Sequence, residues 1–202
     1  MSAKNSAKNI EDLYSLSPMQ QGMLFHSLYA PESGVYVEQV STDLQGDVNI
    51  SAFEQAWQQV VDRHPILRTA FVWEKVEKPL QVVGRQVHLP LIVYDWQNLT
   101  IADQQSKLEA LRQAEQIQGF ELSKAPLMRL ILIQLAPQQY HFLWSHHHLL
   151  LDGWSTSLIL QEVFAFYEAA CQKQSLRLPK PRPYRDYIGW LQQQSLPQAE
   201  AF

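Results

Sequence analysis

The chain has 202 residues, of which 46% are hydrophobic and 18% charged, a composition that excludes disorder for most of its length. Its formal net charge of -4 disfavours nucleic acid as the main ligand, because a phosphate-binding surface needs many clustered basic side chains. No apolar run approaches the roughly 18 residues of a transmembrane helix, so no membrane partner is expected.

The first half of the chain alternates helical and extended patterns. Residues 1–12 are mostly polar, begin with a tandem SAKN repeat and are expected to form a flexible lead-in. Ser17 followed by Pro18 is a typical helix start, and Ser51 with Glu54 has the spacing of a capping box. The predicted elements are a helix over 17–28, a strand over 36–44, a helix over 51–63 and strands over 68–74 and 80–83.

The second half continues this alternation and reaches a proline-rich segment. Residues 128–135 are apolar almost throughout, which predicts a strand buried on both faces. Prolines at 179, 181 and 183 exclude a helix over 178–184 and predict an extended connector. The predicted elements are a helix over 103–118, strands over 128–135 and 140–146, a helix over 155–170 and a final amphipathic segment over 184–194.

The order of these elements favours a layered α/β or α+β domain. The chain has one cysteine, Cys171, so no intramolecular disulfide can form, and a reducing, cytoplasmic location is expected. The N-terminal residues also lack the apolar core of a secretory signal.

The sequence HHHLLLDGW, residues 146–154, is the stretch most indicative of chemistry, and three interpretations compete. A metal site is disfavoured, because neighbouring strand residues point to opposite faces and only His146 and His148 could share one. Buried, hydrogen-bonded structural histidines are the second interpretation, which we prefer for His147. The third is proton transfer, since a histidine can exchange a proton near neutral pH.

Four segments resemble core motifs of the condensation domains of nonribosomal peptide synthetases, and they occur in that family's order. Residues 147–153 have the HHxxxDG pattern, which also occurs in the wider superfamily of chloramphenicol acetyltransferase. The other three are SPMQQGMLFH at 17–26, RHPILRTAF at 63–71 and YRDYIGW at 184–190. The resemblance covers about residues 13–190.

The resemblance implies a fold and a division of the chain. The fold is a chloramphenicol-acetyltransferase-like lobe, a two-layer α/β sandwich in which helices pack a mixed sheet. Residues 13–177 would form the N-terminal lobe of a condensation domain. Residues 178–202 would be a connector and the start of a crossover to a C-terminal lobe, whose motifs this sequence lacks.

The resemblance also implies an activity, formation of an amide bond between a donor peptidyl or aminoacyl thioester and an acceptor aminoacyl thioester. Both substrates would hang on the phosphopantetheine arms of peptidyl carrier domains. The donor and acceptor carrier domains and the C-terminal lobe are therefore the expected partners, and no cofactor or metal is expected to bind the chain directly. The isolated lobe is expected to be inactive, because it supplies only one wall of the substrate tunnel and the C-terminal lobe would supply the other.

By its position in the motif, His148 is the expected catalytic residue, either as a base or by positioning the acceptor amine. Orientation can supply several kcal/mol in such a reaction, and proton removal a further factor of about 10²–10⁴. His147 is expected to be structural.

The residues around these histidines are expected to support the site. Asp152 is expected to pair with Arg68 and so to hold the loop, and Gly153 to let the pantetheine arm approach the backbone closely. Trp154 and Ser155 are expected to line the substrate tunnel.

Three alternatives remain open. Epimerisation domains carry the same histidines, a CoA-dependent acetyltransferase shares HHxxxDG, and a carrier-docking module could have lost its activity. The first motif resembles that of condensation domains that take a D-configured donor residue. The start of the chain at Met1 favours the first domain of a synthetase.

Overall fold

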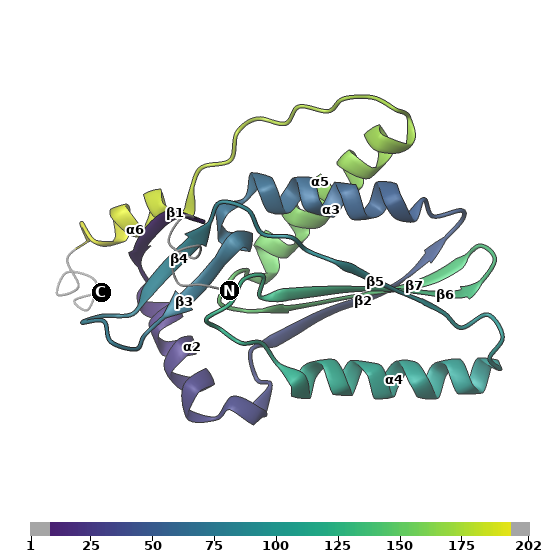
Figure 1. Ribbon diagram of the computed structural model, residues 1–202, viewed down its shortest axis with the longest axis horizontal. Helices are drawn as coiled ribbons and strands as arrows, with labels where there is room; N and C mark the ends of the chain where they lie inside the picture. The colour runs from purple at the N-terminus through teal and green to yellow at the C-terminus, as the bar shows by residue number, and fades with distance from the viewer. Residues whose placement is uncertain (1–8, 195–202) are drawn as a thin grey trace.

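The computed structural model describes residues 9–194, which form two β-sheets packed by helices (Figure 1). The larger sheet has the strand order β2-β7-β6-β5 and the smaller one β1-β4-β3. The strands are β1 (Ile10–Ser15), β2 (Val37–Gln45), β3 (Thr69–Val72), β4 (Leu80–Gly84), β5 (Leu91–Asp95), β6 (Met128–Ala136) and β7 (Gln139–His147). The helices are α2 (Pro18–Tyr29), α3 (Ile50–Arg63), α4 (Ile101–Gln118), α5 (Gly153–Cys171) and α6 (Tyr184–Leu191), with 3₁₀ turns η1 (Pro31–Ser33) and η2 (Pro65–Arg68). Among these residues no helix is long and apolar enough to cross a membrane.

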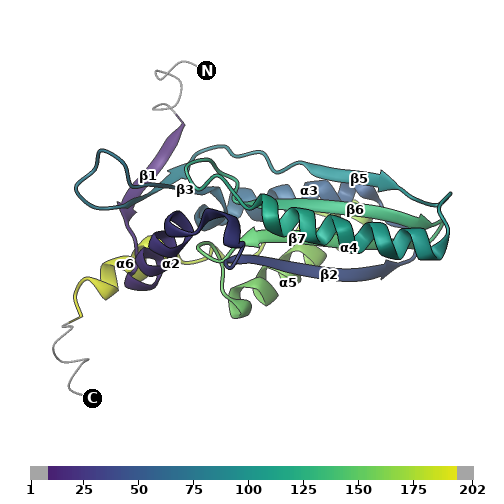
Figure 2. The same cartoon turned by 90° about the horizontal axis from the view of Figure 1, so that it is seen from below.

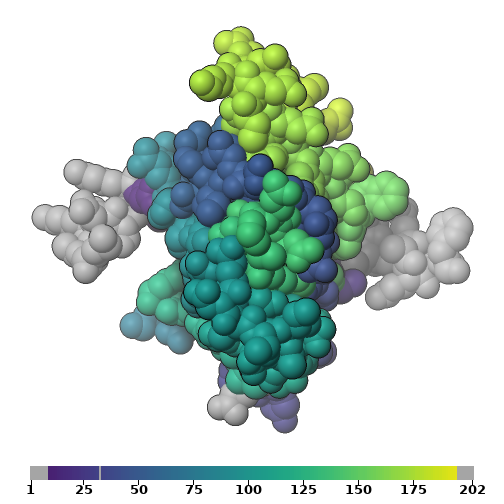
Figure 3. All heavy atoms as spheres, turned by 90° about the vertical axis from the view of Figure 1, so that its right-hand side faces the viewer, coloured from purple at the N-terminus to yellow at the C-terminus, as the bar shows by residue number. Residues whose placement is uncertain are grey.

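Helices cover both faces of the larger sheet. α3 and α5 lie on one face and α4 on the other (Figures 1 and 2). Seen end-on, the β6–β7 hairpin lies between α4 and the α3–α5 pair (Figure 3). The β5–β6 pair is parallel and is joined through α4, whereas β2–β7 and β6–β7 are antiparallel. The expected mixed sheet packed by helices is confirmed.

Side chains of β7 alternate between two cores, because successive strand residues point to opposite faces. Phe142 and Trp144 pack against α3, with ring centroids 5.1 Å from Phe53 and 4.8 Å from Trp57 respectively. Leu143 belongs to the smaller core on the other face. Each fully buried side chain of this size contributes roughly 1.5–3 kcal/mol, so the strand that ends at the histidines is held firmly from both sides.

The sequence predicted the N-terminal cap of helix α2 correctly and that of helix α3 incorrectly. Ser17 caps α2 as expected, accepting from the amide of Gln20 at 3.1 Å. The capping box expected at Ser51 is wrong, because Asn49 caps α3 by accepting from the amide of Ala52 at 3.0 Å. Asn and Ser are about equally good caps. Because the helix begins at Ile50, Asn49 occupies the cap position and Ser51 lies inside the helix.

Two edge strands, β1 and β5, were not predicted. β1 includes residues 10–12, so this part of the expected lead-in is paired with β4, while residues 1–8 lie outside the described structure. In β5, Ile92, Val93 and Tyr94 are all exposed. Edge strands that bury little surface lack the hydrophobic alternation by which a strand is recognised, so their pairing is decided by tertiary contacts.

Residues 174–183 contain no helix or strand and run from α5 to α6, as the prolines predicted (Figure 1). Arg63 at the end of α3 holds this connector, because its guanidinium donates to the carbonyl oxygens of Leu178, at 3.4 Å, and Pro179. The same guanidinium contacts Glu162 of α5, with Nε 2.9 Å from Oε2. The connector is therefore fastened to both helices on one face of the larger sheet.

Arg68 does not pair with Asp152, which corrects the expectation from the sequence. Its buried guanidinium contacts Glu11 of β1, with Nη1 2.5 Å from Oε2, and donates to the carbonyl oxygens of Gly84 and, at 3.2 Å, Val61. The cause is the unpredicted strand β1, which brings a carboxylate to the arginine. Arg68 thereby ties the smaller sheet to the end of α3.

Replacing Arg68 by methionine should lower the free energy of unfolding by about 3 kcal/mol, because it leaves Glu11 and two carbonyl oxygens without their donor. The matched control is Arg185→Met, which removes the partner of Asp12 on the same strand. That arginine is 61% exposed, so its loss should cost less than about 1 kcal/mol. Urea unfolding of both variants makes the comparison, and equal losses would contradict the role assigned to Arg68.

Candidate active site

The three consecutive histidines lie where β7 ends and the chain turns toward α5. Backbone hydrogen bonds hold this turn from two sides. The amide of His147 donates to the carbonyl of Leu127 at 3.0 Å, and the amide of His148 to that of Tyr36 at 2.8 Å. The amide of Leu150 then donates to the carbonyl of His147 at 3.0 Å. The direction of the His148 side chain is thus set by a well-anchored backbone.

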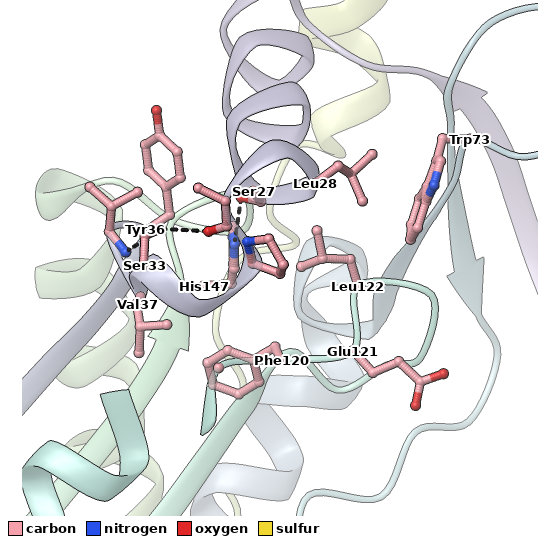
Figure 4. Close-up of a pocket in the computed structure, with 15 residues that line it drawn as sticks. Ser27, Leu28, Ser33, Tyr36, Val37, Trp73, Phe120, Glu121, Leu122 and His147 are labelled. Carbon is pink, nitrogen blue, oxygen red and sulfur yellow. Dashed lines mark hydrogen bonds between the residues drawn. The ribbon is translucent and has the colours of Figure 1, made fainter. Parts of the chain in front are cut away.

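His147 is buried, and its hydrogen bonds define its protonation. Its Nδ1 accepts from the amide of Leu149 at 3.1 Å, so this nitrogen carries no proton. Its Nε2 lies 3.3 Å from the hydroxyl of Ser27 (Figure 4). That hydroxyl itself donates to the carbonyl of Met23 at 2.8 Å. Nε2 is therefore the donor in this pair. Burial lowers the pKa of His147 to about 4, which keeps the ring neutral and able to serve both bonds.

Two cavities lie near the histidines, and the smaller one, of about 250 Å³, opens beside His147. It lies between the end of α2, the start of β2 and the segment that follows α4 (Figure 4). Its wall is largely apolar and includes Trp73, Phe120 and Leu122. His147 therefore faces this smaller cavity and not the larger cavity that His148 lines, which is described below.

His146 is also buried, and its ring packs on Trp144 with centroids 4.7 Å apart. Burial, the main cause, together with neighbouring His148, lowers the pKa of His146 to about 4. Among residues 9–194 there is no group of three His, Cys, Asp or Glu side chains that could hold a metal ion. His146 and His147 are consequently neutral parts of the protein interior.

His148 has different surroundings. Its side chain is 35% exposed, and it lines a cavity of about 560 Å³. The carboxylate of Glu38 lies 4.0 Å from Nδ1, which is beyond hydrogen-bonding distance. Nδ1 of His148 is itself buried and has no hydrogen-bond partner within the described part of the chain. The exposed part of its side chain makes His148 the member of the histidine triplet that lines this cavity.

The walls of this cavity come from segments far apart in the sequence. They are the N-terminal half of α2, the turn after α3, the start of α5 and the region of α6. Lining residues that the sequence did not point to as part of the site include His64, Arg182, Tyr184 and Tyr187. The two tyrosines belong to the YRDYIGW motif, so the signal for them was present in the sequence, but only the fold shows that the motif reaches the histidine.

Asp152 caps α5 and contacts neither Arg68 nor a histidine through a hydrogen bond. It is exposed, and its Oδ1 accepts from the amide of Ser155 at 2.8 Å. This bond is the main cause that lowers the pKa of the Asp152 carboxyl below its usual value. The aspartate therefore secures the position at which the turn becomes a helix.

The three residues that follow Asp152 differ in whether they line the cavity of His148. A Cβ placed on Gly153 would meet no protein atom within 4 Å, so nothing in the described chain requires glycine there. Ser155 lines the cavity of His148. Trp154, which we expected to line the tunnel, is not among the lining residues and is 81% exposed.

Comparison with known protein families matches residues 10–202 to the condensation domain. The chain is 48% identical over 198 residues to one of the linear gramicidin synthase proteins of Brevibacillus parabrevis, covering 98% of this chain and 2% of that protein. It is 37% identical over 190 residues to tyrocidine synthase 2 of the same organism, covering 94% of this chain and 5% of that protein. The chain thus spans a small part of the length of these relatives.

A solved structure shows a similar fold. The starter condensation domain of the rhizomide synthetase RzmA matches with a TM-score of 0.81 and 26% identity, covering 91% of this chain and 45% of that one. The chain therefore corresponds to less than half of that solved domain.

The two neutral histidines should make stability depend on pH. Their pKa values are about 4 in the folded chain and near 6.5 when unfolded, so the unfolded state binds more protons as the pH falls. The unfolding free energy should be constant above pH 7 and decrease below it, by about 2 kcal/mol for each histidine at pH 5. Urea unfolding of His146→Phe should show a shallower decline between pH 7 and pH 5, and an unchanged slope would contradict the assignment.

The capping role of Asp152 predicts that charge matters less than the side-chain oxygen. Asp152→Ala should lower the unfolding free energy by about 1 kcal/mol, and Asp152→Asn by much less, because asparagine also caps helices. Thermal melts of the two variants test this. If asparagine were as damaging as alanine, the carboxylate would be needed for a reason other than the cap.

Proposed function

Because the chain belongs to the condensation-domain family, we propose that it forms one wall of a site where an amide bond joins two carrier-bound substrates. The observation that carries the proposal is the ring of His148, open to a cavity of about 560 Å³ at the end of a rigid strand. The cavity is large enough for the reacting ends of two thioester-linked groups.

In the proposed reaction the amine of an acceptor aminoacyl thioester attacks the carbonyl carbon of a donor thioester. A C–N bond forms, the C–S bond breaks, and the donor carrier's phosphopantetheine arm leaves as a thiol. The amine loses a proton and the departing sulfur gains one. His148 either takes the proton of the amine or holds the amine toward the carbonyl, a role for which orientation alone supplies several kcal/mol.

The surroundings of His148 support this assignment. Its Nδ1 is buried and has no hydrogen-bond partner within the described residues, whereas the side chain as a whole is 35% exposed and lines the cavity. The contact with a substrate group is therefore proposed for the exposed part of the ring. The open space at Gly153, where the chain itself would tolerate a side chain, fits the approach of a pantetheine arm along the backbone. Asp152 enters the proposal as the helix cap that sets the position of this glycine.

The proposed partners are a C-terminal lobe of the same domain and the donor and acceptor carrier domains. Apolar side chains at the rim of the cavity support a covering lobe, since Met19 is 73% exposed and Leu158 and Tyr187 are also exposed. In this proposal residues 13–177 are the N-terminal lobe and residues 178–202 lead across to the other. A D-configured donor residue and a cytoplasmic location, both expected from the sequence, belong to the proposal as well.

The comparisons favour condensation over the alternatives. The matching family model is that of the condensation domain, and the relatives are synthases of gramicidin and tyrocidine. Epimerisation, CoA-dependent acetyl transfer and a scaffold without activity are not favoured by any of these matches.

The proposal predicts a loss of amide formation in a His148→Ala variant of the complete condensation domain. With loaded donor and acceptor carrier domains, the rate of product formation should fall by at least about 100-fold, as measured by mass spectrometry of the acceptor carrier. The 202-residue chain alone should form no product.

The matched control for this variant is His141→Ala. His141 lies on the same strand and bonds to Asp43 and Ser41, away from the cavity. Its replacement should leave the rate within about twofold once folding is verified by circular dichroism. Normal turnover of the His148→Ala variant would exclude His148 from any essential role.

A further inference from the structure

Helix α2 touches the histidine turn at two points, one near each end of the helix. Near its C-terminal end Ser27 contacts His147, as described above. Near its N-terminal end the side chain of Gln20, which is 3% exposed, donates to the carbonyl of Leu149 at 3.0 Å. The helix lies across the end of the larger sheet, beside the turn (Figure 2). Its two contacts therefore span the residue between them, His148.

The amide of Gln20 is held in a single orientation by its own partners. Its Oε1 accepts from the backbone amide of Ser17 at 3.0 Å and from Nε2 of Gln81 at 3.0 Å. Its Nε2 donates to Oε1 of Gln81 at 3.2 Å as well as to Leu149. Gln81 is fully buried and donates in turn to the carbonyl of Ser15 at 3.1 Å. A buried network in which every group is satisfied is rigid.

Two hydrogen bonds consequently flank His148 along the backbone. On the N-terminal side its own amide donates to the carbonyl of Tyr36. On the C-terminal side the peptide directly after His148 is held through the amide of Leu149, which donates to Nδ1 of His147 at 3.1 Å. The carbonyl of Leu149, in the following peptide, accepts from Gln20. Without the bond from Gln20 this following peptide could rotate, and the turn that carries His148 would shift with it. A displacement of about 1 Å at a reacting group can cost a factor of 10² in rate.

We propose that Gln20 is a positioning residue, whose amide, fixed by Gln81 and Ser17, holds the carbonyl of Leu149 and thereby aims the ring of His148 into the cavity. This inference rests on the proposed function for its effect on rate. The aiming of the ring is a property of the chain itself and can be measured without activity.

The variant that separates positioning from packing is Gln20→Glu. A carboxylate has nearly the same shape and still accepts from Ser17 and Gln81, but it has no donor for the carbonyl of Leu149 or for Oε1 of Gln81. The matched control is Gln58→Glu. Gln58 also accepts from a backbone amide, that of Leu89 at 3.1 Å, and donates to a backbone carbonyl, that of Val87 at 2.9 Å, away from the histidines.

The first experiment uses the complete condensation domain with loaded carrier domains. Gln20→Glu should lower kcat at least tenfold and change KM for the acceptor carrier less than twofold, whereas Gln58→Glu should change kcat less than twofold. Equal losses of kcat in the two variants, or no loss in Gln20→Glu, would overturn the inference. If the unaltered domain forms no amide, the proposed function fails and the second experiment alone decides.

The second experiment follows the imidazole carbon–proton signals of His148 by NMR in the 202-residue chain labelled at histidine. Gln20→Glu should shift these signals, while Gln58→Glu leaves them unchanged. Signals of His148 that do not move in Gln20→Glu would overturn the inference. If that variant does not fold, the double variant Gln20→Met, Gln81→Met takes its place. It removes both amides of the pair, so neither amide is left without its partner. The same His148 signals are then measured in the double variant.

Discussion

The site depends on one neutral imidazole that does not itself line the cavity of His148. His147 accepts a hydrogen bond from the backbone of its own turn and donates one to α2, so a single ring joins the turn to the neighbouring helix. Both bonds require that the ring carries one proton, and burial secures this by lowering its pKa to about 4. A charged ring would lose the acceptor at Nδ1 and release the amide of Leu149. One of the hydrogen bonds that hold the backbone next to His148 therefore depends on the protonation of the residue before it.

Consecutive histidines acquire different properties because they lie at the end of a strand. Side chains alternate between the faces of a sheet, so His147 faces the smaller cavity beside α2 and His148 the larger one. Solvation then separates them further. His146 and His147 are buried and neutral, whereas the ring of His148 keeps a third of its surface exposed. One strand thus places buried and cavity-lining imidazoles side by side.

Arg68 and Asp152, which the sequence suggested as partners, each have a separate structural role. Arg68 is a buried cation that needs a carboxylate and carbonyl oxygens around it, and β1 and β4 provide them. Asp152 is exposed and caps a helix, where a side-chain oxygen matters more than a buried counter-ion. The turn is consequently stabilised by hydrogen bonds from α2 and by the cap of α5. It does not rely on an ion pair with the arginine motif.

The sequence by itself predicted the layered α/β architecture, because hydrophobic periodicity is a local property of the chain. The resemblance of four segments to motifs of the condensation domain indicated the family and singled out His148, which the structure places at the cavity. The sequence also predicted the extended connector, since three prolines constrain the backbone wherever they occur. Only the tertiary structure decided that β1 pairs with β4, that Arg68 meets Glu11 and that Gln20 reaches Leu149. These last two contacts join residues separated by 57 and 129 positions, and their partners are chosen by packing in three dimensions, which no local pattern records.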